Sequence, residues 1–311
     1  MKLVFEKLTE SPEEGFAVKV IRGAGFQCPW HFHPECELTL VLQSGGYRMV
    51  GDDITALEPG DLVLVGANLP HIWQNDEHIP GKKQPVHCVL VQFEAQFLGP
   101  ALMDLPALLP IRRLIKRASL GVRVTGRTRQ RAAALILQLV KLRGMGRIIA
   151  FLKILDLLAH SRECRTIASP GFDPQSSPWS ADDQLRLSRV CQFINERLDQ
   201  PIRLGEAARL AHLSEGAFSR FFRRHLRRTF PEFINELRIG RACRLLAETE
   251  MPVTEIAAAC GYTNLSNFNR QFLRFKNSAP RRFRRRIQAI PPNSRRRVTD
   301  ARIRKVSKVV V

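Results

Sequence analysis

The amino-acid sequence predicts a two-domain α+β protein: an N-terminal β-barrel with a helical hairpin, then a C-terminal all-α domain with two helix–turn–helix motifs. Three observations support this prediction. Short runs with the two-residue alternation of strands fill residues 16–95, a helical spacing follows in residues 128–160, and residues 184–286 are almost wholly helical and contain one motif twice. A chain of 311 residues is long enough to bury two separate cores.

The strand-rich segment shows its alternation most clearly in residues 37–43. Leu38 and Leu40 fall on one face of a strand, whereas Glu37, Thr39 and Val41 fall on the other. Turn signals rich in Gly, Asp and Pro recur at residues 44–46, 51–53 and 58–61. Short strands at this spacing are typical of a sandwich or a barrel.

The helical hairpin is predicted from two apolar stripes separated by a glycine pair. Gly144 and Gly146 interrupt the helical pattern. The stripes consist of Leu135, Leu139 and Leu142 before the pair, and of Ile148, Phe151, Leu152, Leu155 and Leu158 after it. Such an apolar face either packs against the barrel or forms a dimer seam, and the sequence leaves both interpretations open.

Composition shifts place the domain boundaries. Residues 163–183 contain three prolines and few apolar side chains, which is typical of a linker, and the basic end of the chain is expected to be disordered. The predicted units are a barrel at 1–110, a hairpin and dimerisation candidate at 111–162, a linker at 163–183, a helical domain at 184–288 and a tail at 289–311.

Charge separates these units strongly. The chain carries a net +20 overall, but residues 1–110 hold 7 Lys and Arg against 14 Asp and Glu, whereas residues 181–311 hold 28 against 12. An acidic front and a basic back indicate a binding or sensing module joined to a nucleic-acid module, although a solvated basic surface is the simpler alternative.

Cysteine use and hydropathy indicate a cytoplasmic protein. The seven cysteines are widely spread and contain no Cys-x-x-Cys pair, which argues against a disulfide framework or a thiolate zinc site. Neither a signal peptide nor an apolar run long enough to span a bilayer is visible. We therefore expect no membrane partner.

The motif in the C-terminal domain is written twice, at residues 204–222 and 253–272. Glu206 recurs as Glu255 at a shift of 49 residues, whereas Arg220 recurs as Arg270 at a shift of 50. The second copy therefore has one extra residue in its turn. Each copy fits a short helix, a turn and a second helix whose phenylalanines are buried.

The exposed face of each second helix is predicted to enter the DNA major groove. Arg can bond two acceptors of guanine there, and Ser or Asn can bond other base edges, so Arg220 and Arg270 are the preferred base readers. The neighbouring Arg223, Arg224, Arg227 and Arg228 are interpreted as phosphate contacts or solvated charge rather than base readers. The predicted DNA-binding residues are Gly216, Ser219, Arg220, Arg223, Ser266, Asn267, Asn269, Arg270 and Arg274.

These motifs resemble those of the AraC/XylS transcriptional regulators. Residues 255–272, with residues 279–284, resemble the C-terminal signature of that family, and residues 206–222 resemble its first helix–turn–helix. The resemblance implies two recognition helices, at residues 215–224 and 265–275, on an asymmetric DNA site. The family's glycine after each recognition helix is replaced here by Arg227 and Asn277, and Arg tolerates the left-handed backbone less well than Asn.

The N-terminal domain contains a second candidate site. His31, His33 and Glu37 have odd numbers, so they would face the same side of one strand, and His71 could join them from a later strand. Three imidazoles and a carboxylate suit a divalent metal. Their spacings resemble both motifs of the cupin barrel, where the matching residues bind metal. The predicted effector-binding set is His31, His33, Glu37, His71 and Trp73.

Two functions compete for this chain. The first is a sequence-specific DNA-binding regulator of transcription, controlled by a small effector such as a sugar in the cupin-like barrel, with no enzymatic activity. It implies promoter DNA, a homodimer and RNA polymerase as partners, and requires no cofactor. The second is a metal-dependent cupin-type enzyme with an accessory DNA-binding domain. The attached DNA module favours the first.

Overall fold

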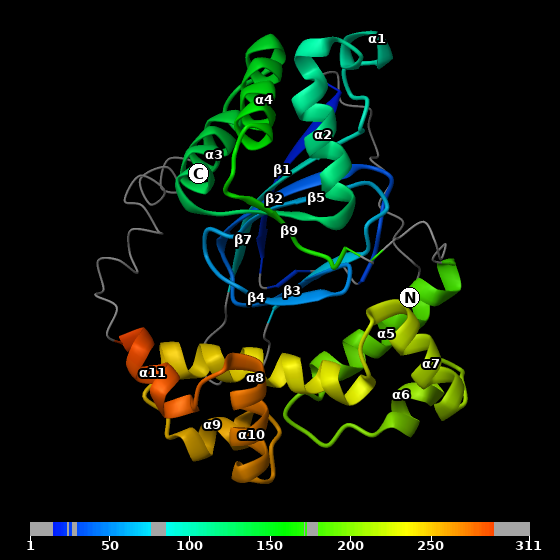
Figure 1. Ribbon diagram of the computed structural model, residues 1–311, viewed down its shortest axis with the longest axis vertical. Coiled ribbons are helices and arrows are strands. Elements are labelled where there is room, and N and C mark those ends of the chain that lie inside the picture. Colours follow the sequence, from blue (N-terminus) through cyan, green and yellow to red (C-terminus); the bar gives the residue numbers. More distant parts are fainter. Residues whose placement is uncertain are drawn as a thin grey trace.

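The computed structural model describes residues 15–23, 25–26, 30–75, 85–170, 172 and 180–288. Three layers follow one another in Figure 1: helices α1–α4, two β-sheets, and the C-terminal helices α5–α11. The two-domain α+β prediction is therefore confirmed. The predicted tail at 289–311 lies outside the described residues.

The larger sheet has six antiparallel strands in the order β1-β7-β2-β5-β8-β9. Its strands are β1 (Phe16–Gly23), β2 (Cys36–Gln43), β5 (Leu62–Val65), β7 (Val86–Phe93), β8 (Val122–Val124) and β9 (Cys164–Thr166). The smaller sheet, in the order β4-β3-β6, contains β3 (Gly46–Val50), β4 (Asp53–Leu57) and β6 (His71–Asn75). Among the described residues the two sheets face each other without closing into one continuous barrel.

The alternation predicted for β2 is confirmed. Leu38 and Leu40 are fully buried in a core shared with the helical layer, whereas Val41 belongs to a second core between the sheets. Each of the three predicted turn segments joins two consecutive strands between β2 and β5. Period-two patterning therefore places Glu37 and Thr39 in the space between the sheets.

The helical layer packs on the outer face of the larger sheet. It comprises α1 (Pro100–Met103), α2 (Leu109–Arg117), α3 (Gly126–Leu139) and α4 (Gly144–Ala159). Phe151 of α4 is fully buried and its ring lies 4.3 Å from that of Phe16 in β1. Packing against the sheet, one of the two interpretations of the hairpin, is thus what the structure shows.

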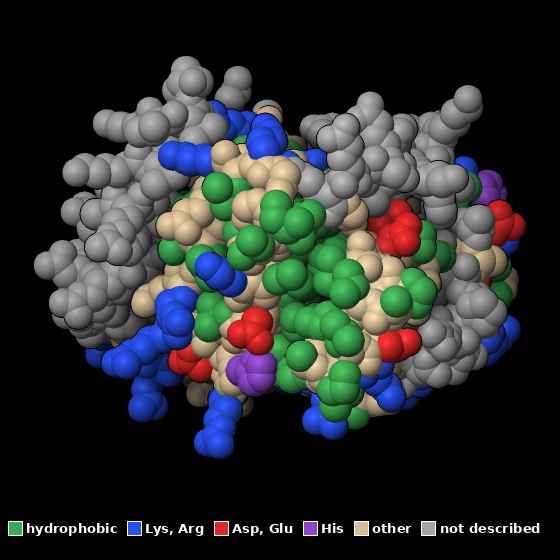
Figure 2. Space-filling view, turned by 90° about the horizontal axis from the view of Figure 1, so that it is seen from above, with side chains coloured by type: hydrophobic (Ala, Val, Ile, Leu, Met, Phe, Trp, Pro, Cys, Tyr) green, Lys and Arg blue, Asp and Glu red, His purple; other side chains and the backbone are tan. Residues whose placement is uncertain are grey.

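Hydrophobic side chains also gather on the outward face of this layer (Figure 2). Met145, at the start of α4, is 68% exposed. The other exposed apolar residues of α1, α4 and the segments beside them are Leu102, Leu105, Leu109, Leu142 and Ile149. A dimer seam on this face stays a prediction.

Seven helices form the C-terminal domain: α5 (Ala181–Glu196), α6 (Leu204–Leu210), α7 (Glu215–Leu226), α8 (Phe230–Glu248), α9 (Val253–Ala259), α10 (Leu265–Lys276) and α11 (Pro280–Gln288). The longest, α8, lies beneath β3 and β4 in Figure 1 and contacts both strands. Among the helices of the described residues, none has the length and apolar character needed to cross a bilayer.

Two predicted boundaries need correction. The segment predicted as linker begins with strand β9, which pairs with β8, and Ala168 is buried between the sheets. The hairpin segment at 111–162 also includes most of α2 and all of β8. Strands β8 and β9 have only three residues each, which is too short to show an alternation.

Candidate nucleic-acid interface and sensor site

The first helix–turn–helix consists of α6 and α7. After α6 the chain turns at His212, whose φ is 54°, and the Leu213 amide donates to the Ala208 carbonyl at 3.0 Å. Ser214 then caps α7 by accepting a hydrogen bond from the Ala217 amide at 3.3 Å. Serine is among the residues that most favour this capping position.

The second motif, α9 and α10, repeats this geometry. Gly261 has a φ of 77°, and the Tyr262 amide donates to the Ala257 carbonyl at 3.0 Å. Asn264 caps α10 by accepting from the Asn267 amide at 3.1 Å.

The position of the extra residue in the second turn follows from these matches. The left-handed residues His212 and Gly261 lie 49 positions apart, whereas the caps Ser214 and Asn264 lie 50 apart. The added residue is therefore Thr263, next to the cap. The turn itself is conserved in shape, and only the approach to the second recognition helix is longer.

Both recognition helices bury phenylalanines and expose polar side chains. Phe218 and Phe222 of α7, like Phe268 and Phe272 of α10, are fully buried. All the predicted DNA-binding residues are exposed except Asn267, which is half-buried. The exposed set has the outward placement that major-groove reading requires.

Three of the predicted DNA-binding residues have protein partners. Arg270 donates to the Asn267 side chain at 2.9 Å, so these two neighbours can act as one polar unit. Arg274 forms an ion pair of 2.9 Å with Glu232 of α8. Arg274 is therefore better placed to support α10 than to read bases.

Both recognition helices end in the left-handed conformation despite lacking the family's glycine. Arg227 has a φ of 54° and Asn277 a φ of 49°, and the amide of each donates to the carbonyl four residues earlier. The departure seen in the sequence thus preserves the geometry of the helix end at both positions.

The predicted sensor residues come together between the two sheets. One potential ligand atom from each of His31, His33, Glu37 and His71 lies within 4.8 Å of the others, and all four residues are buried. Only Glu37 lies on β2, however. His31 forms an isolated bridge with His71, and His33 precedes the strand. The three side chains therefore face the same side, as predicted, but they do not share one strand.

Backbone carbonyls orient two of the imidazoles. His33 Nδ1 lies 3.0 Å from the Glu35 carbonyl oxygen, and His71 Nδ1 lies 2.7 Å from that of Leu69. Because a carbonyl only accepts, each Nδ1 carries a proton. Both Nε2 atoms consequently point into the cluster, 3.3 Å and 3.9 Å from Glu37 Oε2.

The electrostatics of the cluster centre on Glu37. Burial alone would raise the pKa of this carboxyl, but His33 and His71 beside it hold the pKa well below its ordinary value. Burial likewise lowers the pKa of His33, yet the contacts with Glu37 outweigh this effect and raise it. A carboxylate anion faced by imidazoles is therefore the stable state of the site.

These donors fit a divalent metal. Three imidazoles and one carboxylate are borderline and hard ligands that suit zinc, iron or manganese. The Nε2 atom of His71 is buried and has no hydrogen-bond partner in the described part of the chain. Coordination to a metal would satisfy this atom. Carbonyls behind His33 and His71 give the outer support typical of metal-binding imidazoles.

Sequence reasoning missed three neighbours of the cluster. Thr39 donates to Glu37 at 2.7 Å, and the Gln92 amide of β7 approaches the same carboxylate at 3.3 Å. Thr39 could have been found, because it shares the inward face of β2 with Glu37. Gln92 and Glu35, a buried acid 3.4 Å from His33, carry no such local signal.

Aromatic side chains at the site divide between two environments. The ring of Trp73 packs edge-on against His71 at 5.1 Å, beside the four-residue cluster. Trp30, the neighbour of His31, instead lies in a hydrophobic cluster with Ile72 and residues of α5–α8. The four-residue cluster and the C-terminal domain thus lie on opposite faces of the same short sheet.

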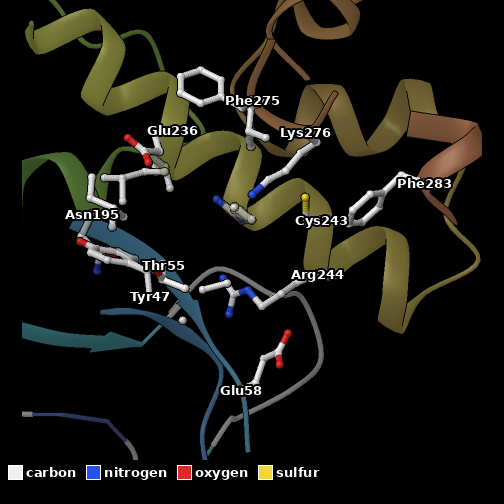
Figure 3. Close-up of a pocket in the computed structure, with 18 of the residues that line it drawn as sticks. Tyr47, Thr55, Glu58, Asn195, Glu236, Cys243, Arg244, Phe275, Lys276 and Phe283 are labelled. Carbon is white, nitrogen blue, oxygen red and sulfur yellow. The ribbon is translucent and has the colours of Figure 1, made fainter. Parts of the chain in front are cut away.

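A cavity of about 330 Å³ lies between the smaller sheet and the C-terminal helices (Figure 3). Tyr47, Thr55 and Glu58 line it from the smaller sheet and its following loop, and Glu236, Arg244 and Lys276 line it from the helices. The sequence did not predict this cavity, because its walls come from segments about 200 residues apart.

Comparison with known proteins agrees with both modules. A family model described as a helix-turn-helix domain matches residues 207–286, and one described as a cupin domain matches residues 18–89. Regulatory protein SoxS of Salmonella typhimurium is 30% identical over 101 residues, which cover 32% of this chain and 94% of that protein.

Two further relatives match different shares of the chain. The transcriptional activator RhaR of Mannheimia succiniciproducens is 23% identical over 275 residues, 83% of this chain and 88% of RhaR. The chain spans 41% of the length of the probable regulator LumQ of Photobacterium leiognathi, at 25% identity over 32% of this chain.

Among solved structures, an AraC-type regulator from Chromobacterium violaceum is 25% identical, with a TM-score of 0.33, over 36% of this chain and 99% of that one. This overlap is too slight to add to the sequence matches. The paired helix–turn–helix motifs, the cupin segment and the near-complete coverage of SoxS show that the chain belongs to the AraC family of transcriptional regulators.

Proposed function

We propose that this protein binds double-stranded DNA sequence-specifically and regulates transcription in response to a small molecule. The observation that carries the proposal is the pair of exposed recognition faces on α7 and α10, each anchored by two buried phenylalanines. One arginine stands at the matching position of each face, Arg220 and Arg270. Their neighbours differ, so the two helices read different bases and the site is asymmetric.

Substitution of the two arginines tests DNA reading. Arg220→Ala and Arg270→Ala should each weaken binding to the selected DNA site by roughly tenfold or more, because a bidentate contact to guanine contributes about 1–3 kcal/mol of discrimination. Binding to unrelated DNA should change far less. Arg113→Ala, which removes an exposed arginine of α2, is the matched control. If both recognition variants keep full specificity, these arginines are not the readers.

Control by a small molecule is supported by the position of the sensor residues. His71 faces the cluster, while the next residue of β6, Ile72, faces the C-terminal domain. A ligand that shifts this strand therefore shifts the surface on which α5 and α8 rest. The ligand changes DNA affinity only as far as it prefers one domain arrangement over another.

The effector is proposed to be a small polar molecule, with a sugar as the first candidate, held by His31, His33, Glu37, His71 and Trp73. Titration of the purified protein with candidates while DNA binding is followed tests this point. A ligand that binds the wild type but not Glu37→Gln, and that shifts DNA affinity, supports the assignment. Binding unaffected by Glu37→Gln places the effector elsewhere.

We further propose that the four-residue cluster holds a divalent metal, whose chemistry would be to polarise an oxygen of the effector. Co²⁺ added to the full chain should give the visible absorption of an imidazole-bound ion. His71→Ala should weaken this binding, whereas His160→Ala, which removes an exposed histidine, should not. No bound metal under any condition, with an intact effector response, would end this proposal.

The same cluster is the one observation that favours the alternative function, a metal-dependent cupin-type enzyme. Turnover of candidate substrates by the metal-loaded protein, lost in Glu37→Gln, would support that alternative. A homodimer and contact with RNA polymerase belong to the regulatory proposal. Sedimentation of the purified chain tests the dimer.

A further inference from the structure

Helix α8 belongs to two hydrophobic cores at once. Its first half packs in the core of the first helix–turn–helix through Phe230, Phe233, Ile234 and Leu237. Its second half packs in the core of the second motif through Ile239, Ala242, Leu245 and Leu246. The two DNA-reading units therefore have separate cores that change over at a single residue of α8, Arg238.

Arg238 extends to both sides of this boundary. Its Nε donates to the Leu198 carbonyl at 2.9 Å and its Nη2 to the Gln200 carbonyl at 2.6 Å, in the loop that leads into α6. The guanidinium also lies 5.6 Å from the ring centre of Tyr262, in the turn of the second motif. One side chain thus contacts the first and the second unit.

Tyr262 completes the connection from the other side. Its hydroxyl donates to Asn235 of α8 at 2.9 Å, and burial raises the pKa of this hydroxyl, so it remains a donor. The Asn235 amide is held in turn by the Pro231 carbonyl at 2.8 Å. The Tyr262 ring packs edge-on against Phe268, the first anchor of α10, at 5.3 Å.

The glycine before Tyr262 permits this close approach. A Cβ at Gly261 would lie 2.6 Å from the Leu198 carbonyl oxygen and 2.8 Å from the Arg238 guanidinium. The left-handed turn of the second motif therefore rests directly on the loop of the first. The ion pair between Arg274 of α10 and Glu232, on the first half of α8, crosses the same boundary.

We propose that Arg238 and Tyr262 fix the angle between the two recognition helices and so set the separation between the two DNA elements that the chain reads. Apolar packing is non-directional, whereas hydrogen bonds have a defined geometry, so these bonds restrict how the two units can rotate against each other at the core boundary. One extra base pair moves an element by about 3.4 Å and rotates it by about 35°. Arg238 and Tyr262 are positioning residues with no contact to DNA, and the inference rests on the proposed function.

Spacing preference is the property that tests this role. Sites are selected from random DNA with the full-length wild type, and the best site is remade with one base pair added or removed between its two elements. The wild type should lose at least about tenfold in affinity on either change. For the two variants, the same change of spacing should reduce DNA affinity by about threefold or less. Arg238→Met keeps the length of the side chain, and Tyr262→Phe removes one oxygen atom.

A matched control separates positioning from general destabilisation. Ile256→Val weakens the second core without touching the boundary and should keep the spacing preference of the wild type. If Arg238→Met does not fold, Tyr262→Phe alone decides. Variants that keep the full spacing preference, or that lose affinity equally at every spacing, overturn the inference. A wild type that selects no sequence at all refutes the proposed function instead, and one that selects elements at variable spacing refutes the inference alone.

Discussion

Loss of the Asp61 carboxylate should strongly destabilise the sensor domain. Asp61, next to β5 of the larger sheet, accepts a hydrogen bond of 2.7 Å from Nε of Arg48 on β3 of the smaller sheet. Both side chains are at most 2% exposed. Arg123 of β8 approaches the same carboxylate at 3.3 Å but is 36% exposed. The Arg48–Asp61 pair is thus a buried ionic contact between the two sheets.

The expected size follows from burial. Asp61→Ala leaves the Arg48 guanidinium in the core with Asp53, 3.7 Å away and 35% exposed, as its remaining acidic neighbour among the described residues. Breaking a buried pair in this way costs about 3–5 kcal/mol, whereas an exposed pair contributes about 0–1 kcal/mol. Asp53→Ala, which removes the exposed partner, is therefore the matched control.

Urea denaturation followed by tryptophan fluorescence measures the effect, because Trp30 and Trp73 are both buried in this domain. The double variant Arg48→Met with Asp61→Leu should recover most of the lost stability, since an apolar pair of similar volume avoids the cost of burying charge. If Asp61→Ala destabilises the domain no more than Asp53→Ala, the pair does not hold the sheets together.

Two further predictions concern the DNA-binding domain. Arg227→Gly should raise the free energy of unfolding by about 1 kcal/mol in urea melts, because it removes an arginine from a left-handed backbone conformation. Asn277→Gly should raise it less, since Asn tolerates that conformation better. Equal gains would contradict this reasoning. Hydrogen bonds from Thr229, with the contact to Arg274, lower the pKa of Glu232 to about 2, below the roughly 4.3 of an unfolded chain. The stability that this contributes is complete above about pH 4.3 and is lost as the pH falls towards 2. The stability difference between the wild type and Glu232→Gln should therefore be about 1 kcal/mol at pH 6 and nearly vanish near pH 2; a difference independent of pH would contradict it.

Local periodicity explains why the DNA-binding domain could be predicted so closely. The caps Ser214 and Asn264 accept from amides only three residues further along the chain, because helix ends are satisfied locally. The left-handed Arg227 could be suspected only from its alignment with a glycine of the family. Its backbone conformation is imposed by the helix end.

The sensor site was predicted from spacing and resemblance together. Alternation placed Glu37 inside the domain, but it gave the wrong reason for His31 and His33, which do not share its strand. The bridge between His31 and His71 joins segments forty residues apart. Strand pairing at that separation is decided by long-range packing, which local patterning does not encode.

The sequence by itself determined the two modules, the repeated motif and the residues that face outward on its recognition helices, because these depend on periods of two and 3.6 residues. Only the tertiary structure decided how the modules meet. Helix α8 packs against β3 and β4, which lie far from it in the chain. The hydrogen bonds of Arg238 and the buried Arg48–Asp61 pair also join distant segments. Contacts of this kind are selected by the packing of whole elements, and they place the two copies of the motif side by side on one helix.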